Sequence, residues 1–226
     1  MKRFAVIFLI LALLASLCAC VGKPRGADKK AESWEPNPEG GTTIPSEANE
    51  AFRDAMENYP GVGYVPMAYL GSQVVAGTNY AYLCRNTTLS VEPVTTLTTV
   101  LVYKSLSGQS SILRFEDVNV ASFASDTTPT AEMGEAGGWQ INREYSGSMP
   151  ADAQAAFDQA VEGLSGKQYM PLACLGSRTA EGREYAVLCT ETRGEEDPSA
   201  ALVVLVIFVD QGGNTSVSNI TGFEIP

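Results

Sequence analysis

The sequence predicts an α+β fold made of two tandem α-β-β-β-β repeats, each an antiparallel sheet wrapped over one helix. Three observations lead to this fold class. The chain repeats itself at a fixed spacing, each repeat opens with an apolar stripe at helical spacing, and four strand-like segments follow the stripe. With 226 residues, of which 45% are apolar and 18% charged, the chain is long enough to bury a core in both repeats.

The repeat is recognised from one segment that occurs twice. Residues 64–72 (YVPMAYLGS) recur as residues 169–177 (YMPLACLGS), 105 positions later. The same offset aligns further pairs as far as Gly108 and Gly213 without an insertion, which indicates a duplication. Between the copies, residues 139–141 are a candidate extra strand of the second repeat. The predicted boundaries are 44–120 for the first repeat, 121–148 for the linker and 149–225 for the second repeat.

The amino terminus has the pattern of an export signal. Lys2 and Arg3 precede an apolar run over residues 4–17, which is shorter than the roughly 20 residues that cross a bilayer. The next residues, LCAC, resemble the bacterial lipobox, in which cleavage leaves the last cysteine, here Cys20, as the lipid-modified first residue. Cys18 as the anchor, and a cleaved signal without a lipid, are the two alternatives.

This resemblance implies an exported bacterial lipoprotein that is anchored to the cell membrane at the cell surface. Residues 1–19 would be the signal peptide that is removed. Residues 20–43 are rich in glycine, proline and charge, with few large apolar side chains, and we expect them to form a lipidated flexible tether.

Each repeat is predicted to begin with a helix. Pro45 and Pro150 mark the two starts, because proline is favoured at the beginning of a helix. The apolar residues then recur at the spacing i, i+3, i+4, i+7, and most of them are alanine, so the helix is expected to lie close to its sheet. These residues are Ala48, Ala51, Phe52 and Ala55 in the first repeat and Ala153, Ala156, Phe157 and Ala160 in the second.

Four strands are predicted after each helix. In the first repeat they cover residues 64–71, 78–84, 97–104 and 111–118, which are rich in valine, tyrosine, threonine and leucine. In the second repeat, residues 202–209 are apolar at every position, which indicates a strand with both faces covered. One helix covers only one face. The outer faces of the two sheets are therefore expected to pack on each other, or on a second chain in a homodimer.

The composition excludes several kinds of function. The chain has no histidine, the usual base of serine and cysteine nucleophiles and a frequent metal ligand, so we expect no enzyme, no cofactor and no metal site. Carboxylate chemistry remains open, although no paired-carboxylate motif supports it. The 26 acidic and 15 basic residues give a net charge of −11 and argue against binding to nucleic acid.

Three cysteines follow the signal region. We expect Cys84, Cys174 and Cys189 to be buried free thiols that act as small apolar residues, with a Cys84–Cys189 disulfide as the alternative. On the predicted hairpin, Cys174 and Cys189 are expected to be out of register and on opposite faces, which disfavours a bond between them.

A short motif between the first two strands of the first repeat suggests a function. The residues QVVAG, followed by Thr78, Asn79 and Tyr80, resemble the cystatin family's binding loop in its stefin form. Residues 103–109 (YKSLSGQ) resemble the second binding hairpin of stefins, with Ser107 where proline is usual. The resemblance implies a cystatin-like fold and inhibition of papain-like cysteine proteases, in which two hairpins and a glycine of the amino-terminal trunk fill the active-site cleft.

The same resemblance assigns the residues that would contact a protease, with either of two glycines in the trunk position. They are Gln73, Val74, Val75, Ala76, Gly77, Leu106, Ser107, Gly108, and Gly40 or Gly41. In the second repeat the motif reads RTAEG over residues 178–182, so only the first repeat is expected to inhibit.

Other readings stay open. The alternative function is a surface module that binds another protein through the same scaffold without inhibiting it. Tandem units of this order also resemble β-lactamase-inhibitory proteins and small exported PepSY-like modules, which bind protein partners. The acidic residues 195–197, with Glu191, are expected to form a solvated loop rather than a calcium site.

Overall fold

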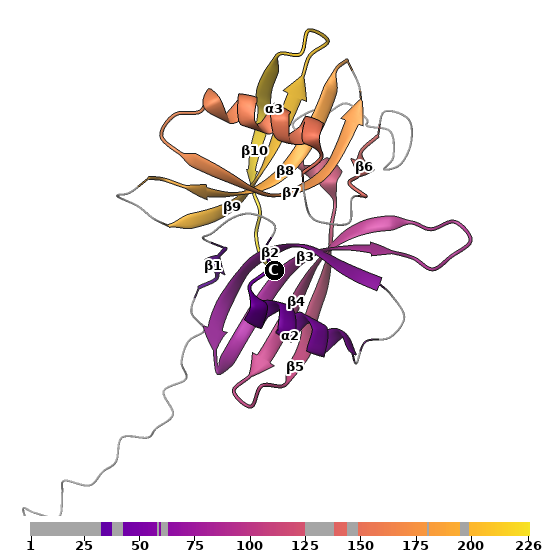
Figure 1. The fold of residues 1–226 in the computed structure, drawn as a ribbon, viewed down its shortest axis with the longest axis vertical. Coiled ribbons are helices and arrows are strands. Elements are labelled where there is room, and N and C mark those ends of the chain that lie inside the picture. Colours follow the sequence, from indigo (N-terminus) through magenta and orange to yellow (C-terminus); the bar gives the residue numbers. More distant parts are fainter. Residues whose placement is uncertain are drawn as a thin grey trace, which may run out of the picture. The chain divides into compact units, whose positions relative to one another are not determined.

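The computed structural model describes residues 33–37, 43–57, 59, 63–124, 138–143, 149–179, 181–194 and 199–226. Residues Ala31–Pro226 form one compact unit. Within its described part, the unit contains two antiparallel five-stranded sheets, and Figure 1 shows one α-helix lying across each sheet. The fold is therefore α+β, as predicted.

The first sheet has the spatial order β1-β2-β3-β4-β5, so each strand lies beside its neighbour in the sequence. All four strands predicted for this repeat are present, and each begins before its predicted first residue or ends after its predicted last one. The elements are β1 (Glu35–Pro36), α2 (Ser46–Glu57), β2 (Gly63–Val75), β3 (Gly77–Thr87), β4 (Thr95–Ser105) and β5 (Ser110–Val118).

The second sheet has the matching order β10-β9-β8-β7-β6, and its helix starts 105 residues after the first. A short 3-10 helix, η1 (Val120–Phe123), follows β5. The elements are β6 (Gln140–Ile141), α3 (Ala151–Glu162), β7 (Gln168–Thr179), β8 (Arg183–Thr192), β9 (Ala200–Val209) and β10 (Thr215–Gly222).

The two helices bury the predicted alanine stripes. The carbonyl oxygens of Pro45 and Pro150 accept the first helical hydrogen bonds, at 2.9 and 2.8 Å. Small side chains let the helix backbone approach the sheet, and the hydroxyl of Tyr82 donates to the carbonyl of Ala48 at 2.6 Å. The buried helix residues are those predicted, namely Ala48, Ala51, Phe52 and Ala55 in α2 and Ala153, Ala156, Phe157 and Ala160 in α3.

Strand β9 is buried on both faces, as its unbroken apolar sequence predicts. Val203, Leu205 and Ile207 pack in the cluster beneath α3, whereas Val204 and Val206 point to the opposite face and are at most 1% exposed. The helix-free faces of both sheets contribute to a single hydrophobic cluster, which we call the shared core. The prediction that these faces pack on each other is confirmed within one chain.

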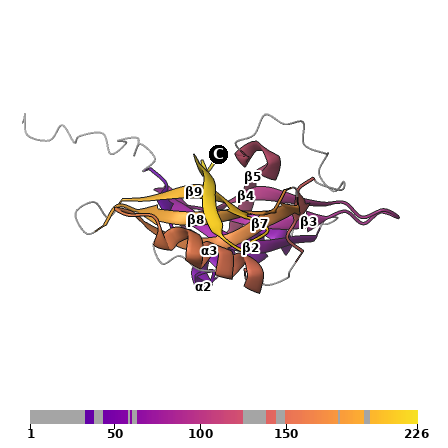
Figure 2. The same cartoon turned by 90° about the horizontal axis from the view of Figure 1, so that it is seen from above.

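The shared core also includes segments that lie outside the sheets. Phe123 of η1 packs near Phe223 of the carboxyl-terminal segment, with ring centroids 6.2 Å apart. Figure 2 shows η1 and the carboxyl terminus on the other side of the strands from α2 and α3. The buried members from the two sheets are Met67, Ala68, Leu70, Ala81, Leu83, Leu97, Leu101, Leu172, Ala173, Leu175, Ala186, Leu188, Leu202, Val204 and Val206.

Each sheet begins with a strand before its helix. The predicted extra strand of the second repeat is present as β6, which pairs with β7, and Trp139 beside it is 1% exposed. An equivalent strand, β1, pairs with β2 in the first repeat. The assignment of residues 20–43 to a flexible tether is therefore wrong for Trp34–Asn37, because this stretch supplies a strand and the buried Asn37.

A β-bulge changes which face the cysteines of the second repeat occupy. Leu175 is an extra residue in β7 between Cys174 and the turn, and Leu172 is a second one, so the alternation of side chains shifts by one position at Cys174. Cys174 then lies opposite Val187, two residues from Cys189 on β8, and both cysteines belong to the cluster beneath α3. The expectation that they lie on opposite faces was wrong, because the sequence pattern did not include the bulge.

Candidate functional site

The predicted binding motif forms the turn between β2 and β3. Strand β2 ends at Val75 and β3 begins at Gly77, so Ala76 alone lies between the paired residues. Val74 is 44% exposed and Ala76 is also exposed, whereas Val75 is half-buried and Gly77 is buried. The motif therefore exposes Val74 and Ala76 to solvent rather than all five of its residues.

Two motif residues have structural roles. Gln73 lies opposite Asn79, whose side-chain amide donates to Oε1 of Gln73 at 2.9 Å across the two strands. A Cβ atom on Gly77 would lie 2.4 Å from the carbonyl oxygen of Lys104 and 2.8 Å from the ring of Tyr103, so only glycine fits there. The hydroxyl of Tyr103 donates to the carbonyl of Ala76 at 2.6 Å and holds the turn in place.

The second repeat repeats this glycine contact without the motif. A Cβ atom on Gly182 would lie 2.3 Å from the carbonyl oxygen of Val209 and 2.7 Å from the ring of Phe208. Both repeats therefore need the glycine so that the turn fits beneath an aromatic ring. Gly77 by itself says nothing about a protease.

The second predicted hairpin is the turn between β4 and β5. The amide of Gly108 donates to the carbonyl of Ser105 at 2.9 Å, and the amide of Ser105 donates to the carbonyl of Gln109 at 2.9 Å. Gly108 has a φ of +89°, which favours glycine. Leu106, the first residue after β4, is 87% exposed.

The two turns lie next to each other. Gly77 is paired with Ser105 in the ladder between β3 and β4, so both turns are at the same end of the sheet. Together, residues 73–77 and 105–109 contain no charged side chain, and they expose Val74 and Leu106. We call these two turns the paired tips. Lys104, just before the second turn, is charged, and its Nζ atom lies 3.3 Å from Oε1 of Glu47 on α2.

The equivalent turns of the second repeat are polar. Arg178 is ion-paired with Glu184, and Gln211 is at the position equivalent to Leu106. Asp210 accepts hydrogen bonds from the side chain and the backbone amide of Asn214, both at 2.8 Å, and these bonds lower the pKa of the Asp210 carboxyl. The exposed apolar tips are thus specific to the first repeat.

The third part of the predicted site, the glycine of the amino-terminal trunk, is not among the described residues. Gly40 and Gly41 lie outside the part of the chain that the structure describes, as does Cys20, the residue predicted to carry the lipid. Because β1 runs antiparallel to β2 with Glu35 opposite Ser72, the chain before β1, at Ser33 and Trp34, lies on the tip side. The sequence signal for this was the match of Trp34 with Trp139 at the repeat offset.

The described cysteines are free and buried, as predicted. Burial raises the pKa of the Cys84 and Cys189 thiols, so both are kept in the protonated, unreactive form. Cys84 packs beneath α2 and Cys189 beneath α3, in separate clusters, which is incompatible with a bond between them. Their burial is typical of cysteines that have a structural role.

Comparison of the chain with known proteins identifies no relative. No protein-family model matches the chain, and no curated protein matches its sequence. Within the described residues, no helix has the length and apolar character needed to cross a membrane. In the same residues, no three Cys, Asp or Glu side chains are grouped in a way that could hold a metal ion.

Proposed function

We propose that this chain is a cell-surface lipoprotein with cystatin-like repeats, and that its paired tips bind a papain-like cysteine protease as an inhibitor. The observation that carries the proposal is the pairing of Gly77 with Ser105, which joins two uncharged turns with exposed apolar side chains. The chain would be anchored through Cys20. Mass spectrometry of the mature amino terminus tests this, and an unmodified Cys20 would contradict the anchor.

The proposed inhibition is a matter of shape rather than chemistry. Val74 and Leu106 would supply apolar contact in the cleft, while the uncharged turns would enter it without burying an unpaired charge. The hydrogen bonds from Tyr103 and within the second turn hold both tips before binding, which lowers the entropy lost on association. The protein needs no catalytic group of its own for this role.

Substitution of the exposed tip residues tests the proposal. Residues 31–226 are titrated against a papain-like protease, with and without Val74→Arg and Leu106→Arg. We expect inhibition by the unchanged protein and a rise of about tenfold or more in the inhibition constant of the double variant, because two apolar anchors become charged. The matched control is Thr179→Arg with Gln211→Arg, the equivalent pair on the second repeat, which we expect to leave inhibition unchanged.

Two results would contradict the proposal. One is no inhibition by the unchanged protein, and the other is an equal loss in the tip variant and its control. Gly77 is unsuitable for this test, because any side chain there collides with Lys104 and Tyr103 and would disturb the fold itself.

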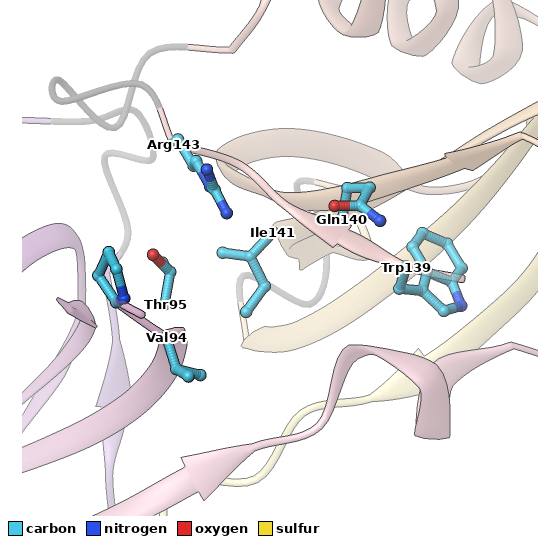
Figure 3. A pocket seen from close by; sticks show the side chains of 7 residues that line it. Val94, Thr95, Trp139, Gln140, Ile141 and Arg143 are labelled. Atoms are coloured by element: carbon cyan, nitrogen blue, oxygen red, sulfur yellow. The ribbon is translucent and has the colours of Figure 1, made fainter. Parts of the chain in front are cut away.

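A second candidate function rests on a different exposed loop. Between β3 and β4, Leu89 is 90% exposed, Val91 is fully exposed and Val94 is 57% exposed. Figure 3 shows Val94 and Thr95 across a groove from Ile141 and Arg143. The second repeat has Gly194, Glu196 and Ser199 at the positions equivalent to the three apolar residues, which favours binding of a protein partner through this loop without inhibition.

The same titration separates the two candidates. The variant Leu89→Ser with Val91→Ser leaves the paired tips intact. Under the inhibitor proposal it inhibits as well as the unchanged protein. If the loop is the binding surface, protease inhibition is absent throughout, and this variant rather than the tip variant loses binding to the partner.

A further inference from the structure

The outer edge of β5 has no partner strand among the residues that the structure describes. Strand β5 is last in the order of the first sheet and pairs only with β4, from Ser110 opposite Lys104 to Val118 opposite Leu97. The edge of a sheet presents backbone N–H and C=O groups that can bind another strand. The side chains of β5 decide which strand fits.

The sequence of β5 is complementary to itself in the antiparallel direction. We propose that β5 pairs with β5 of a second copy about a two-fold axis at Phe115. In this register Arg114 lies opposite Glu116 of the second copy, and Glu116 lies opposite its Arg114. The two pairs of opposite charge match without any change in the strand.

The exposed side chains of this edge suit such a contact. Arg114 and Glu116 are on one face of the strand, 56% and 55% exposed, with 3.4 Å between Nη1 of Arg114 and Oε2 of Glu116. Each can therefore turn to a second copy without losing a buried partner. Leu113, the bulged residue of β5, is 53% exposed and would be partly covered.

The other face of β5 carries aromatic side chains. The ring of Phe115 stacks on that of Tyr64, with centroids 4.8 Å apart, and its centroid lies 4.9 Å from that of Tyr59. Tyr59 is 43% exposed. Tyr59, Ala55 and residues 110–115 line a groove along the edge. A two-fold axis at Phe115 would place this aromatic group beside its own copy and remove apolar surface from water.

The equivalent edge of the second sheet lacks this pattern. Strand β10 has Asn219, Ile220 and Thr221 at the positions of Arg114, Phe115 and Glu116. The side chain of Asn219 already donates to the carbonyl of Phe123 at 2.7 Å and to Thr221 at 3.0 Å. Charge complementarity therefore selects β5 of a second copy, rather than β10, as the partner strand.

A charge-swap experiment tests the register. The oligomeric state of residues 31–226 is measured by sedimentation velocity from about 1 to about 500 µM, because one strand gives a contact smaller than a standard interface. We expect dimers at the upper concentrations. Arg114→Glu, or Glu116→Arg, places like charges opposite each other twice and should raise the dissociation constant about tenfold or more.

Mixing the two single variants is the decisive measurement. In a mixed dimer every position 114 faces an opposite charge at position 116 of the other chain, while within each chain the two residues still carry like charges. We expect the mixture to dimerise as the unchanged protein does, which an effect within one chain cannot produce. Circular dichroism confirms that each variant is folded.

The outcomes decide the proposal without depending on the function of the paired tips. A monomer over the whole concentration range overturns the proposal. Dimers that both single variants retain also overturn it, because they would use another surface. If the single variants are monomeric and the mixture stays monomeric, the register is wrong. Protease inhibition is measured separately, so its failure is distinguishable from failure of the dimer.

Discussion

At one pair of equivalent positions, the two repeats use different chemistry. In the first repeat Gln73 and Asn79 form a neutral hydrogen bond between β2 and β3. In the second repeat Arg178 and Glu184 form an ion pair at the same place, with side chains only 5% and 12% exposed. Arg178 also lies over the ring of Trp139, 5.2 Å from its centroid. Both pairs join equivalent strands, but the charged pair bears the larger cost of desolvation.

The two versions predict how the second repeat responds to substitution. Arg178→Gln alone leaves Glu184 without its cation in a buried place, so we expect the free energy of unfolding to fall by about 3–5 kcal/mol. Adding Glu184→Asn rebuilds the amide pair of the first repeat and should recover most of the loss. Urea unfolding followed by circular dichroism measures both variants.

The control for this prediction is a more exposed ion pair on the same repeat. Arg183 and Asp152 are 51% and 49% exposed, with 3.2 Å between Nη1 and Oδ2, so Arg183→Gln should cost less than about 1 kcal/mol. The prediction is contradicted if Arg178→Gln is no worse than Arg183→Gln, or if the double variant is no better than Arg178→Gln alone.

At the scale of elements, the helices and long strands could be predicted because each has a period. Four apolar residues at helical spacing identify α2. Strand β9 is identified by an unbroken apolar run, because a strand with only one covered face would alternate. Strands β1 and β6 have two residues each, too few to show any alternation. The sequence feature that accompanies them lies in the strands they pair with, at Gly71 and Gly176. A Cβ atom on either glycine would lie within 2.5 Å of a carbonyl oxygen of β1 or β6.

The candidate site was predictable in its position and not in its details. Antiparallel order places the turns at 76 and 106 at one end of the sheet, so their adjacency follows from the strand assignment. Which motif residues face solvent depends on the pairing register and on the ring of Tyr103, and neither has a sequence signal. The motif alone therefore could not separate Val74, which is exposed, from Gly77, which is needed for packing.

For the whole molecule, the shared core makes the two repeats depend on each other. Each helix has its own cluster against one sheet, but the helix-free faces meet in one cluster that contains residues of both repeats. Removing either repeat would expose the apolar face of the other to water. The two repeats are therefore expected to unfold together rather than one after the other.

The two tryptophans of the chain make this testable, because one precedes the first strand of each sheet. Trp34→Phe leaves Trp139 as the only tryptophan, next to β6 of the second sheet, and Trp139→Phe leaves Trp34, next to β1 of the first sheet. In each variant, the fluorescence change and the loss of far-ultraviolet circular dichroism should have the same urea midpoint. A fluorescence transition that is clearly separate from the circular dichroism transition would show that the repeats unfold independently.

Strand β1 also determines how the fold would carry mechanical tension. The chain that precedes the fold enters at β1, whose two residues pair with β2. Next to β1, the backbone amide of Asn37 donates to the carbonyl of Leu70 at 2.9 Å, and the hydroxyl of Thr190 in the second sheet donates to the carbonyl of Asn37 at 3.1 Å. A pull on the amino-terminal side therefore loads these few bonds first, while the long ladders of β2 to β5 stay relaxed. Under such a pull, we expect β1 to detach and release length before either helix or the paired tips are disturbed.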